Sequence, residues 1–257
     1  MVRRRIAVGA ISLAVLGATL TTTAPSAQAA HSSFAILPDL VMLPPTDFMI
    51  QQRPRGVRWL RFSTVIVNLG PGAFQAYGSD ADGASIGDVL SVVQEIQEPG
   101  GGFSEHPTTA SMFYSGDGHD HWHVRDLQEW TLQNQNAQVL ARGAKTGFCF
   151  WDNYDYAATT KAYYHPTTTD ACEIAPDGTV PMGLSVRWGD RYPSNIAFQY
   201  IDISGLPNGE YKVTVAADPP LAEGGRFIEA NEGNNTSWAR IRIAKKTVTV
   251  LELAPLP

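Results

Sequence analysis

The chain has 257 residues, of which 44% are hydrophobic and 17% charged, and its formal net charge is −6. An acidic chain does not favour nucleic acid or anionic lipid as partners, although it raises the local concentration of cationic substrates. The length suffices for one sizeable hydrophobic core or two small ones. We therefore expect a globular protein with no nucleic-acid partner.

Residues 1–29 predict a signal peptide. Residues 3–5 are arginines, residues 6–20 are almost entirely apolar, and residues 27–29 (AQA) form a small-x-small cleavage signal. The apolar run is too short for a comfortable membrane span, and the arginines are compatible with either the general secretory or the twin-arginine route. We expect residues 30–257 to be secreted, with no membrane insertion after cleavage. Losing three arginines and no acid changes the net charge from −6 to −9.

Short apolar and alternating runs follow, and none shows helical periodicity over more than about three turns. Long loops are expected from residue 99 to the first clustered histidine and from residue 152 to residue 180. With turn signals at short intervals, this pattern predicts an all-β protein, a single twisted β-sandwich with long irregular loops and little helix. The expected strands cover residues 38–45, 58–68, 91–97, 125–132, 137–142, 145–151, 197–203, 211–216 and, as the last strand, 237–243.

Residues 116–126 read GDGHDHWHVRD and place His119, His121 and His123 at alternate positions. In a strand these side chains share one face, spread over about 13 Å of backbone. Neutral imidazoles suit Cu, Zn, Fe and Ni, and three of them leave a coordination position open for water, oxygen or substrate. The alternative is a polar, exposed strand edge. We favour a metal site.

The chain has two cysteines, Cys149 and Cys172. In an oxidising compartment, one disulfide between them is the simplest use. The competing use is a copper site that combines cysteine and histidine.

Several separate blocks between residues 116 and 243 resemble the lysyl oxidase family. The blocks follow one another in the family's order, which makes their combination far more specific than any one of them. They are GHDHWH at residues 118–123, GAKTGFC at 143–149, GLS at 183–185, DRY at 190–192, QYIDI at 199–203, GEY at 209–211 and NN at 234–235.

The resemblance implies a copper site and a self-derived cofactor. His119, His121 and His123 match the family's copper-binding run, and Lys145 and Tyr192 match the two halves of its lysine tyrosylquinone. The implied activity is that of a secreted amine oxidase, which uses O₂ to convert primary amines (peptidyl lysine, lysine or diamines) to aldehydes with release of ammonia and hydrogen peroxide.

Each matched residue also has an ordinary interpretation. Lys145 alone would be a strand-edge lysine, and Tyr192 a packing tyrosine with a hydrogen-bonded hydroxyl. Asp190 is either the base that removes a substrate proton or an Asx-turn residue, and we favour the turn.

A group near the C-terminus could also be taken for calcium ligands. No regular calcium loop is present, so turn capping is the preferred interpretation. The group comprises Glu229, Glu232, Asn234 and Asn235.

Two further functional classes remain open. One is a non-catalytic extracellular metal-binding β-sandwich, an adhesion or binding module, which would need neither Lys145 nor Tyr192. The other is a zinc hydrolase, ranked last because no carboxylate stands at a familiar metalloprotease spacing from the histidines.

Overall fold

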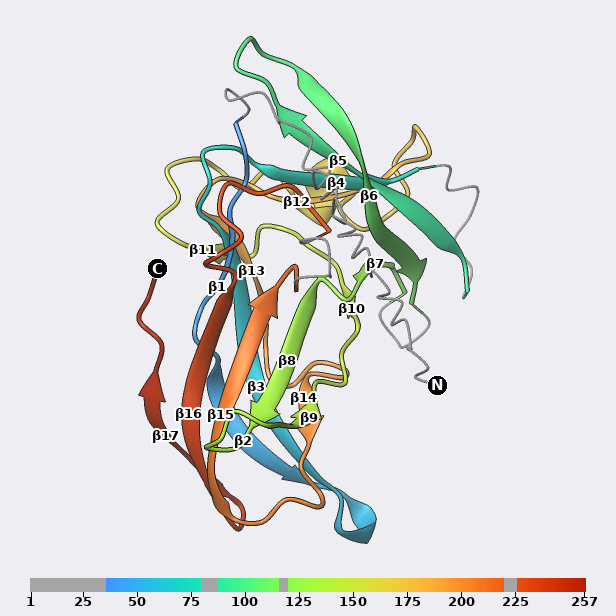
Figure 1. Ribbon diagram of the computed structural model, residues 1–257. Helices are drawn as coiled ribbons and strands as arrows, with labels where there is room; N and C mark the ends of the chain where they lie inside the picture. Colours follow the sequence, from blue (N-terminus) through green and yellow to red (C-terminus); the bar gives the residue numbers. More distant parts are fainter. Residues whose placement is uncertain (1–35, 80–86, 116–119, 220–225) are drawn as a thin grey trace, which may run out of the picture. The chain divides into compact units, whose positions relative to one another are not determined.

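The computed structural model describes residues 36–79, 87–115, 120–219 and 226–257 (Figure 1). Within these ranges the strands form three antiparallel sheets. The first half of the described chain contains β1 (Leu40–Met42), β2 (Thr46–Gln52), β3 (Arg58–Asn68), β4 (Phe74–Gly78), β5 (Val89–Gln97), β6 (Phe103–Tyr114), β7 (Trp122–Arg125) and β8 (Gln128–Gln133). The second half contains β9 (Val139–Arg142), β10 (Gly147–Phe148), β11 (Tyr154–Asp155), β12 (Val180–Leu184), β13 (Trp188–Tyr192), β14 (Tyr200–Asp202), β15 (Gly209–Ala217), β16 (Thr236–Ala244) and β17 (Thr247–Leu253).

The first sheet is centred on β3, whose predicted bounds are confirmed. The first half of β3 pairs with β2 and β14, and its second half pairs with β1 and β13. This one long strand fixes the position of β13 through the pairs Asp190 with Ile66 and Tyr192 with Thr64. The strand that carries the candidate cofactor tyrosine is therefore held by regular backbone pairing.

The second sheet has the order β10-β7-β6-β5-β4-β12, and one of its strands was not predicted from the sequence. The expected loop after residue 99 is instead the strand β6, which pairs with β5 in a long hairpin (Figure 1). Pro107 lies where the register shifts between Ser91 and Val93, and a bulge is one of the places where a strand tolerates proline. The Thr108 hydroxyl donates to the Val92 carbonyl there at 2.7 Å.

The third sheet, β17-β16-β15-β8-β9, contains the predicted hairpin of β8 and β9. The prediction that residues 237–243 form the last strand is wrong, because β17 follows and pairs with β16. Lys245, with φ 55°, lies in the turn that joins them. β17 is an edge strand in which no side chain is fully buried, although residues 247–250 alternate between threonine and valine in the sequence.

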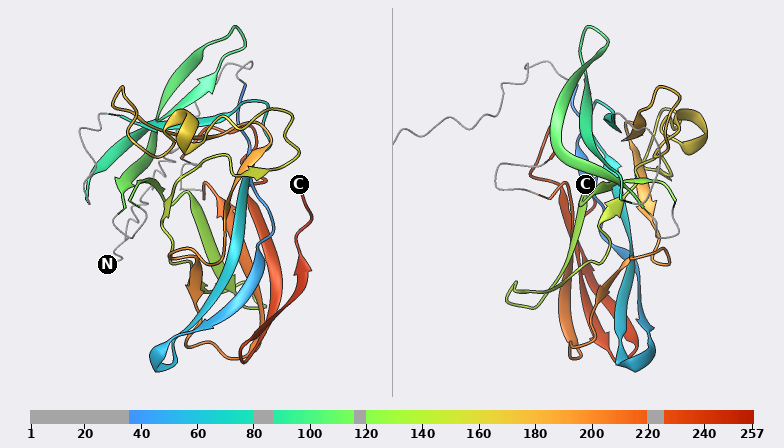
Figure 2. Two further views of the ribbon diagram at one scale, coloured as in Figure 1. Left: turned by 180° about the vertical axis from the view of Figure 1, so that it is seen from behind. Right: turned by 90° about the vertical axis from the view of Figure 1, so that its right-hand side faces the viewer.

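The core lies between the sheets. Figure 2 shows β2 and β3 in one layer and β15 to β17 in the other. Phe62 of β3 packs edge-on against Trp130 of β8, with ring centroids 5.4 Å apart, and both belong to the main cluster of buried side chains. The predicted all-β sandwich is confirmed.

Residues 152–180 are mostly irregular, as predicted. They contain β11, the four-residue helix α1 (Pro166–Thr169) and, at Val180, the first residue of β12. None of the helices in the described ranges has the length and apolar character needed to cross a membrane.

Candidate active site

Lys145 is a buried lysine in the segment between β9 and β10, with 7% of its surface exposed. The backbone around it is tied to two sheets. The Ala144 amide donates to the Tyr200 carbonyl at 2.9 Å, and the Asp126 amide donates to the Thr146 carbonyl at 2.7 Å. The prediction of a strand over residues 145–151 is correct only for residues 147–148, which form β10. Lys145 therefore lies in the loop before β10, and these backbone hydrogen bonds fix its position.

Tyr192 is the last residue of β13 and is also buried. Its hydroxyl donates to the Cys149 carbonyl at 2.6 Å, and its ring packs edge-on against Phe148 with centroids 5.4 Å apart. The Lys145 Nζ lies 5.5 Å from the centroid of the Tyr192 ring and 5.4 Å from that of Phe148. The fold thus brings together two side chains separated by 46 intervening residues.

The clustered histidines are only partly described. His119 lies outside the described residues, whereas His121 immediately precedes β7 and His123 lies within it. The rings of His121 and His123 have centroids 4.5 Å apart. Two imidazoles at this separation can bind one ion through nitrogens about 2.0–2.1 Å from it, a donor set suited to copper or zinc. These residues therefore fit a metal centre.

Asp190 shares a face of β13 with Tyr192 and is 1% exposed. The turn interpretation is wrong, because Asp190 is paired within the sheet. Asn153 donates from Nδ2 to the Asp190 Oδ1, while the buried Oδ2 has no hydrogen-bond partner in the part of the chain that the structure describes. Burial raises the pKa of Asp190 from 3.8 to about 7, because a buried carboxylate loses hydration that these contacts only partly replace.

The same buried environment also shifts the pKa of the Tyr192 phenol. Burial and the neighbouring Asp190 charge raise its pKa well above 10. The phenol is therefore neutral in the resting protein, and its single proton is directed to the Cys149 carbonyl.

Cys149 and Cys172 form the predicted disulfide, with Cα atoms 5.8 Å apart. The bridge joins the segment after β10 to the irregular region and lies at the wall of the site. Because the Cys149 carbonyl accepts the Tyr192 hydroxyl, the disulfide also stabilises the position of the phenol's partner.

These residues line one pocket of about 350 Å³. Lys145, Asp190 and Tyr192 are three of its buried members, whereas Asn153, Glu173 and Arg191 are three of its exposed ones. We call the two groups the floor and the rim. The full lining is His121, His123, Lys145, Cys149, Trp151, Asn153, Pro166, Ala171, Cys172, Glu173, Asp190, Arg191, Tyr192, Pro193 and Ile196.

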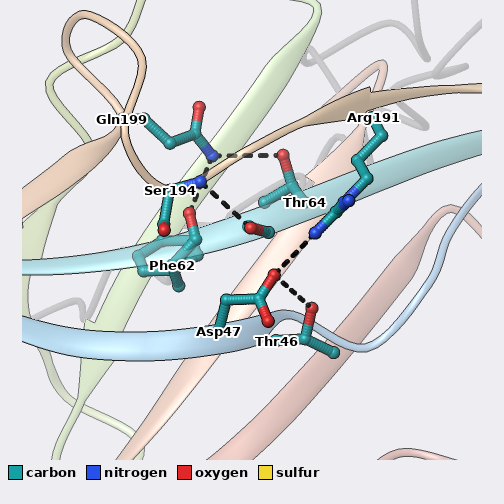
Figure 3. Close-up of polar contacts among 8 residues, drawn as sticks. Thr46, Asp47, Phe62, Thr64, Arg191, Ser194 and Gln199 are labelled. Carbon is teal, nitrogen blue, oxygen red and sulfur yellow. Dashed lines mark hydrogen bonds and ion pairs between the residues drawn. The ribbon is translucent and has the colours of Figure 1, made fainter. Parts of the chain in front are cut away.

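Arg191 points away from the floor residues of its strand. Its guanidinium forms an ion pair with Asp47 of β2 at 2.8 Å (Figure 3). The same view shows Gln199 donating to the Phe62 carbonyl and to Thr64, which ties the segment after β13 back to β3. The positive charge at the rim is therefore already compensated.

Sequence reasoning missed Asn153. Its side chain joins two neighbours on β13, because Nδ2 donates to Asp190 and Oδ1 accepts from the Arg191 amide at 2.7 Å. No pattern marks this residue in the sequence, since its role depends on the pairing of β11 with β13.

The acidic group near the C-terminus anchors the backbone. Glu229 accepts hydrogen bonds from the Leu40 amide and from the Asn235 side chain, linking β1 to the segment before β16. Carboxylate oxygens of Asp218, Glu229 and Glu232 lie within 4.8 Å of one another, and burial raises the pKa of Glu229 to about 9.

Comparison with known proteins agrees with the motif blocks. The family model described as lysyl oxidase matches residues 91–252, well over half of the chain. Lysyl oxidase homolog 2 of Gallus gallus is 30% identical over 127 residues, and the Homo sapiens and Bos taurus proteins of that name are each 28% identical over 127 residues. The aligned part is 49% of this chain but 14% of each relative's length. The chain belongs to the lysyl oxidase family.

Proposed function

We propose that residues 30–257 form a secreted amine oxidase that depends on copper and on a quinone made from Lys145 and Tyr192. Its substrates would be primary amines (peptidyl lysine, lysine or diamines), and its products an aldehyde, ammonia and hydrogen peroxide, with O₂ as the oxidant. Residues 1–29 would be removed as a signal peptide during export.

One observation carries the proposal. The Lys145 Nζ and the Tyr192 ring lie 5.5 Å apart in the same pocket as His121 and His123. The rotatable bonds of a lysine side chain can close that separation without moving the backbone. A binding module would have no use for a buried lysine placed over a buried tyrosine beside two histidines.

Each residue then has a role of its own. His119, His121 and His123 would hold copper, and copper with the quinone would supply the two-electron oxidation of the bound amine. With O₂ as the oxidant of the Tyr192 ring, the Lys145 Nζ would form a C–N bond to a ring carbon in place of a ring hydrogen, and the C–H and N–H protons would leave to solvent. Asp190 would accept the proton from the substrate carbon, a role for which a pKa of about 7 is well suited. Asn153 would orient the Asp190 carboxyl.

The decisive experiment is peptide mass spectrometry of copper-loaded, aerated protein. It should find a cross-linked peptide that contains Lys145 and Tyr192. Tyr192→Phe and Lys145→Ala should both lose the cross-link, the colour formed with phenylhydrazine and all peroxide production from amines. Both variants should keep their copper. Turnover that survives Tyr192→Phe would overturn the assignment in favour of another copper chemistry.

A further inference from the structure

The pocket rim carries an acidic side chain that none of the roles above uses. Glu173 directly follows the disulfide-bonded Cys172 and is exposed at the rim. Its amide donates to the Asp170 carbonyl at 2.8 Å, and the disulfide holds the preceding residue against the site wall, so the backbone at this position is fixed.

The charge of Glu173 is not compensated. Its carboxylate has neither an ion pair nor a hydrogen bond within the described ranges, whereas the other charged rim residue, Arg191, is paired with Asp47. Partial burial and the nearby Asp170 raise the pKa of Glu173, as expected for a carboxylate beside a second negative charge with no cation between them. A cation bound at the rim would offset the repulsion between these two carboxylates and stabilise the ionised form of Glu173.

We infer that Glu173 makes the site prefer amines that carry a second positive charge, which it binds at the rim while the reacting amine reaches the floor. The inference rests on the proposed amine oxidation and adds its substrate class: diamines, and lysine side chains next to another cationic group. A substrate with a single amine cannot bind to the Glu173 carboxylate while that amine reacts at the floor.

The test compares 1,5-diaminopentane with 1-aminopentane, which has the same carbon chain and one charge fewer. Glu173→Gln should lower kcat/KM for the diamine about fivefold, mainly through KM, and should change the value for the monoamine by less than about twofold. Glu173→Asp should restore most of the preference, and Glu173→Lys should weaken diamine binding further. High salt should reduce the preference of the wild type.

Glu252→Gln is the control for the net charge of the protein, because it removes one acidic charge from β17, where Glu252 pairs with Arg240 outside the pocket lining. It should leave both amines unaffected. The inference would be overturned if Glu173→Gln lowered kcat/KM equally for both amines. It would also be overturned if the variant left kcat/KM unchanged for both.

A binding measurement separates this inference from the proposed function. Calorimetry on the Tyr192→Phe background, which should not turn over, measures binding of the two amines alone. Tighter binding of the diamine that disappears with Glu173→Gln would support the inference even if the wild type oxidised neither amine. Equal binding of the two amines would refute it even in an active oxidase.

Discussion

At the residue scale, the proposed amine oxidation depends on the ionisation of Asp190. Burial raises its pKa to about 7, so the carboxyl is protonated in mildly acidic solution and ionised above neutrality. If Asp190 is the base, kcat of the wild type should rise with pH through about 7. Asp190→Asn should not show that rise. Its kcat should be lower by about 100-fold or more, since a positioned base typically contributes 10²–10⁴-fold.

Stopped-flow or steady-state peroxide assays between pH 5.5 and 9 would measure this profile. Asp155→Asn is a suitable control, because Asp155 is an exposed acid on the neighbouring strand β11. A wild-type profile that is flat through neutrality, or one retained by Asp190→Asn, would assign the base to another group.

At the element scale, the disulfide links the segment after β10 to an irregular region. The two cysteines are separated by 23 positions, and closing a loop of that size stabilises a fold by about 3 kcal/mol in the chain-entropy description. A Cys149→Ala/Cys172→Ala variant should therefore melt about 10 °C lower in calorimetry. It should also lose amine oxidation, because the segment whose Cys149 carbonyl accepts the Tyr192 hydrogen bond is no longer held by the bridge. Full activity in a destabilised variant would show that the bridge serves stability alone.

The pairing of β10 with β7 leaves no room at Gly147. A Cβ there would lie 2.6 Å from the tip of the Phe113 ring and 3.0 Å from the His123 Cβ, so the Phe113 ring would have to move and His123 would be displaced by a few tenths of an ångström. Gly147→Ala should weaken copper binding, measured by competition with a chelator, while leaving the strand content of the circular dichroism spectrum intact. Gly205→Ala is the control, because nothing lies within 4 Å of its added Cβ. Equal copper affinity in the two variants would contradict this packing argument.

At the scale of the whole molecule, buried acids make stability depend on pH. Folding raises the pKa of Asp190 to about 7 and that of Glu229 to about 9, so the folded state binds more protons than the unfolded chain between about pH 4 and pH 9. The stabilisation they give is complete below about pH 4 and is lost as the pH rises through 7 and 9. Urea denaturation of the metal-free protein should therefore give a free energy of unfolding lower at pH 8.5 than at pH 5 by about 1 kcal/mol or more.

Glu229→Gln should remove much of that slope, because glutamine keeps an acceptor for the Leu40 amide and carries no charge. A free energy of unfolding that increases from pH 5 to pH 8.5 would contradict this prediction.

The amino-acid sequence by itself determined the β class, several strands, the family and the disulfide pair. Those features depend on local alternation, turn residues, short motif blocks and cysteine count, all of which can be read within a few residues. The long strand β3 and the hairpin of β8 and β9 were predictable for this reason. β6 was missed because Ser, Thr, Gly and Pro gave a loop composition to a segment that hairpin pairing holds as a strand.

Only the tertiary structure decided how the site is assembled. The approach of Lys145 to Tyr192 depends on β13 pairing with β3, and on loop bonds from the lysine segment to β14 and to the turn after β7. The contacts of Asp190 with Asn153, and the exposed position of Glu173 at the pocket rim, likewise join segments far apart in the chain. Such contacts follow from strand register and packing, which are set by the whole core together and leave no periodic signal in the sequence.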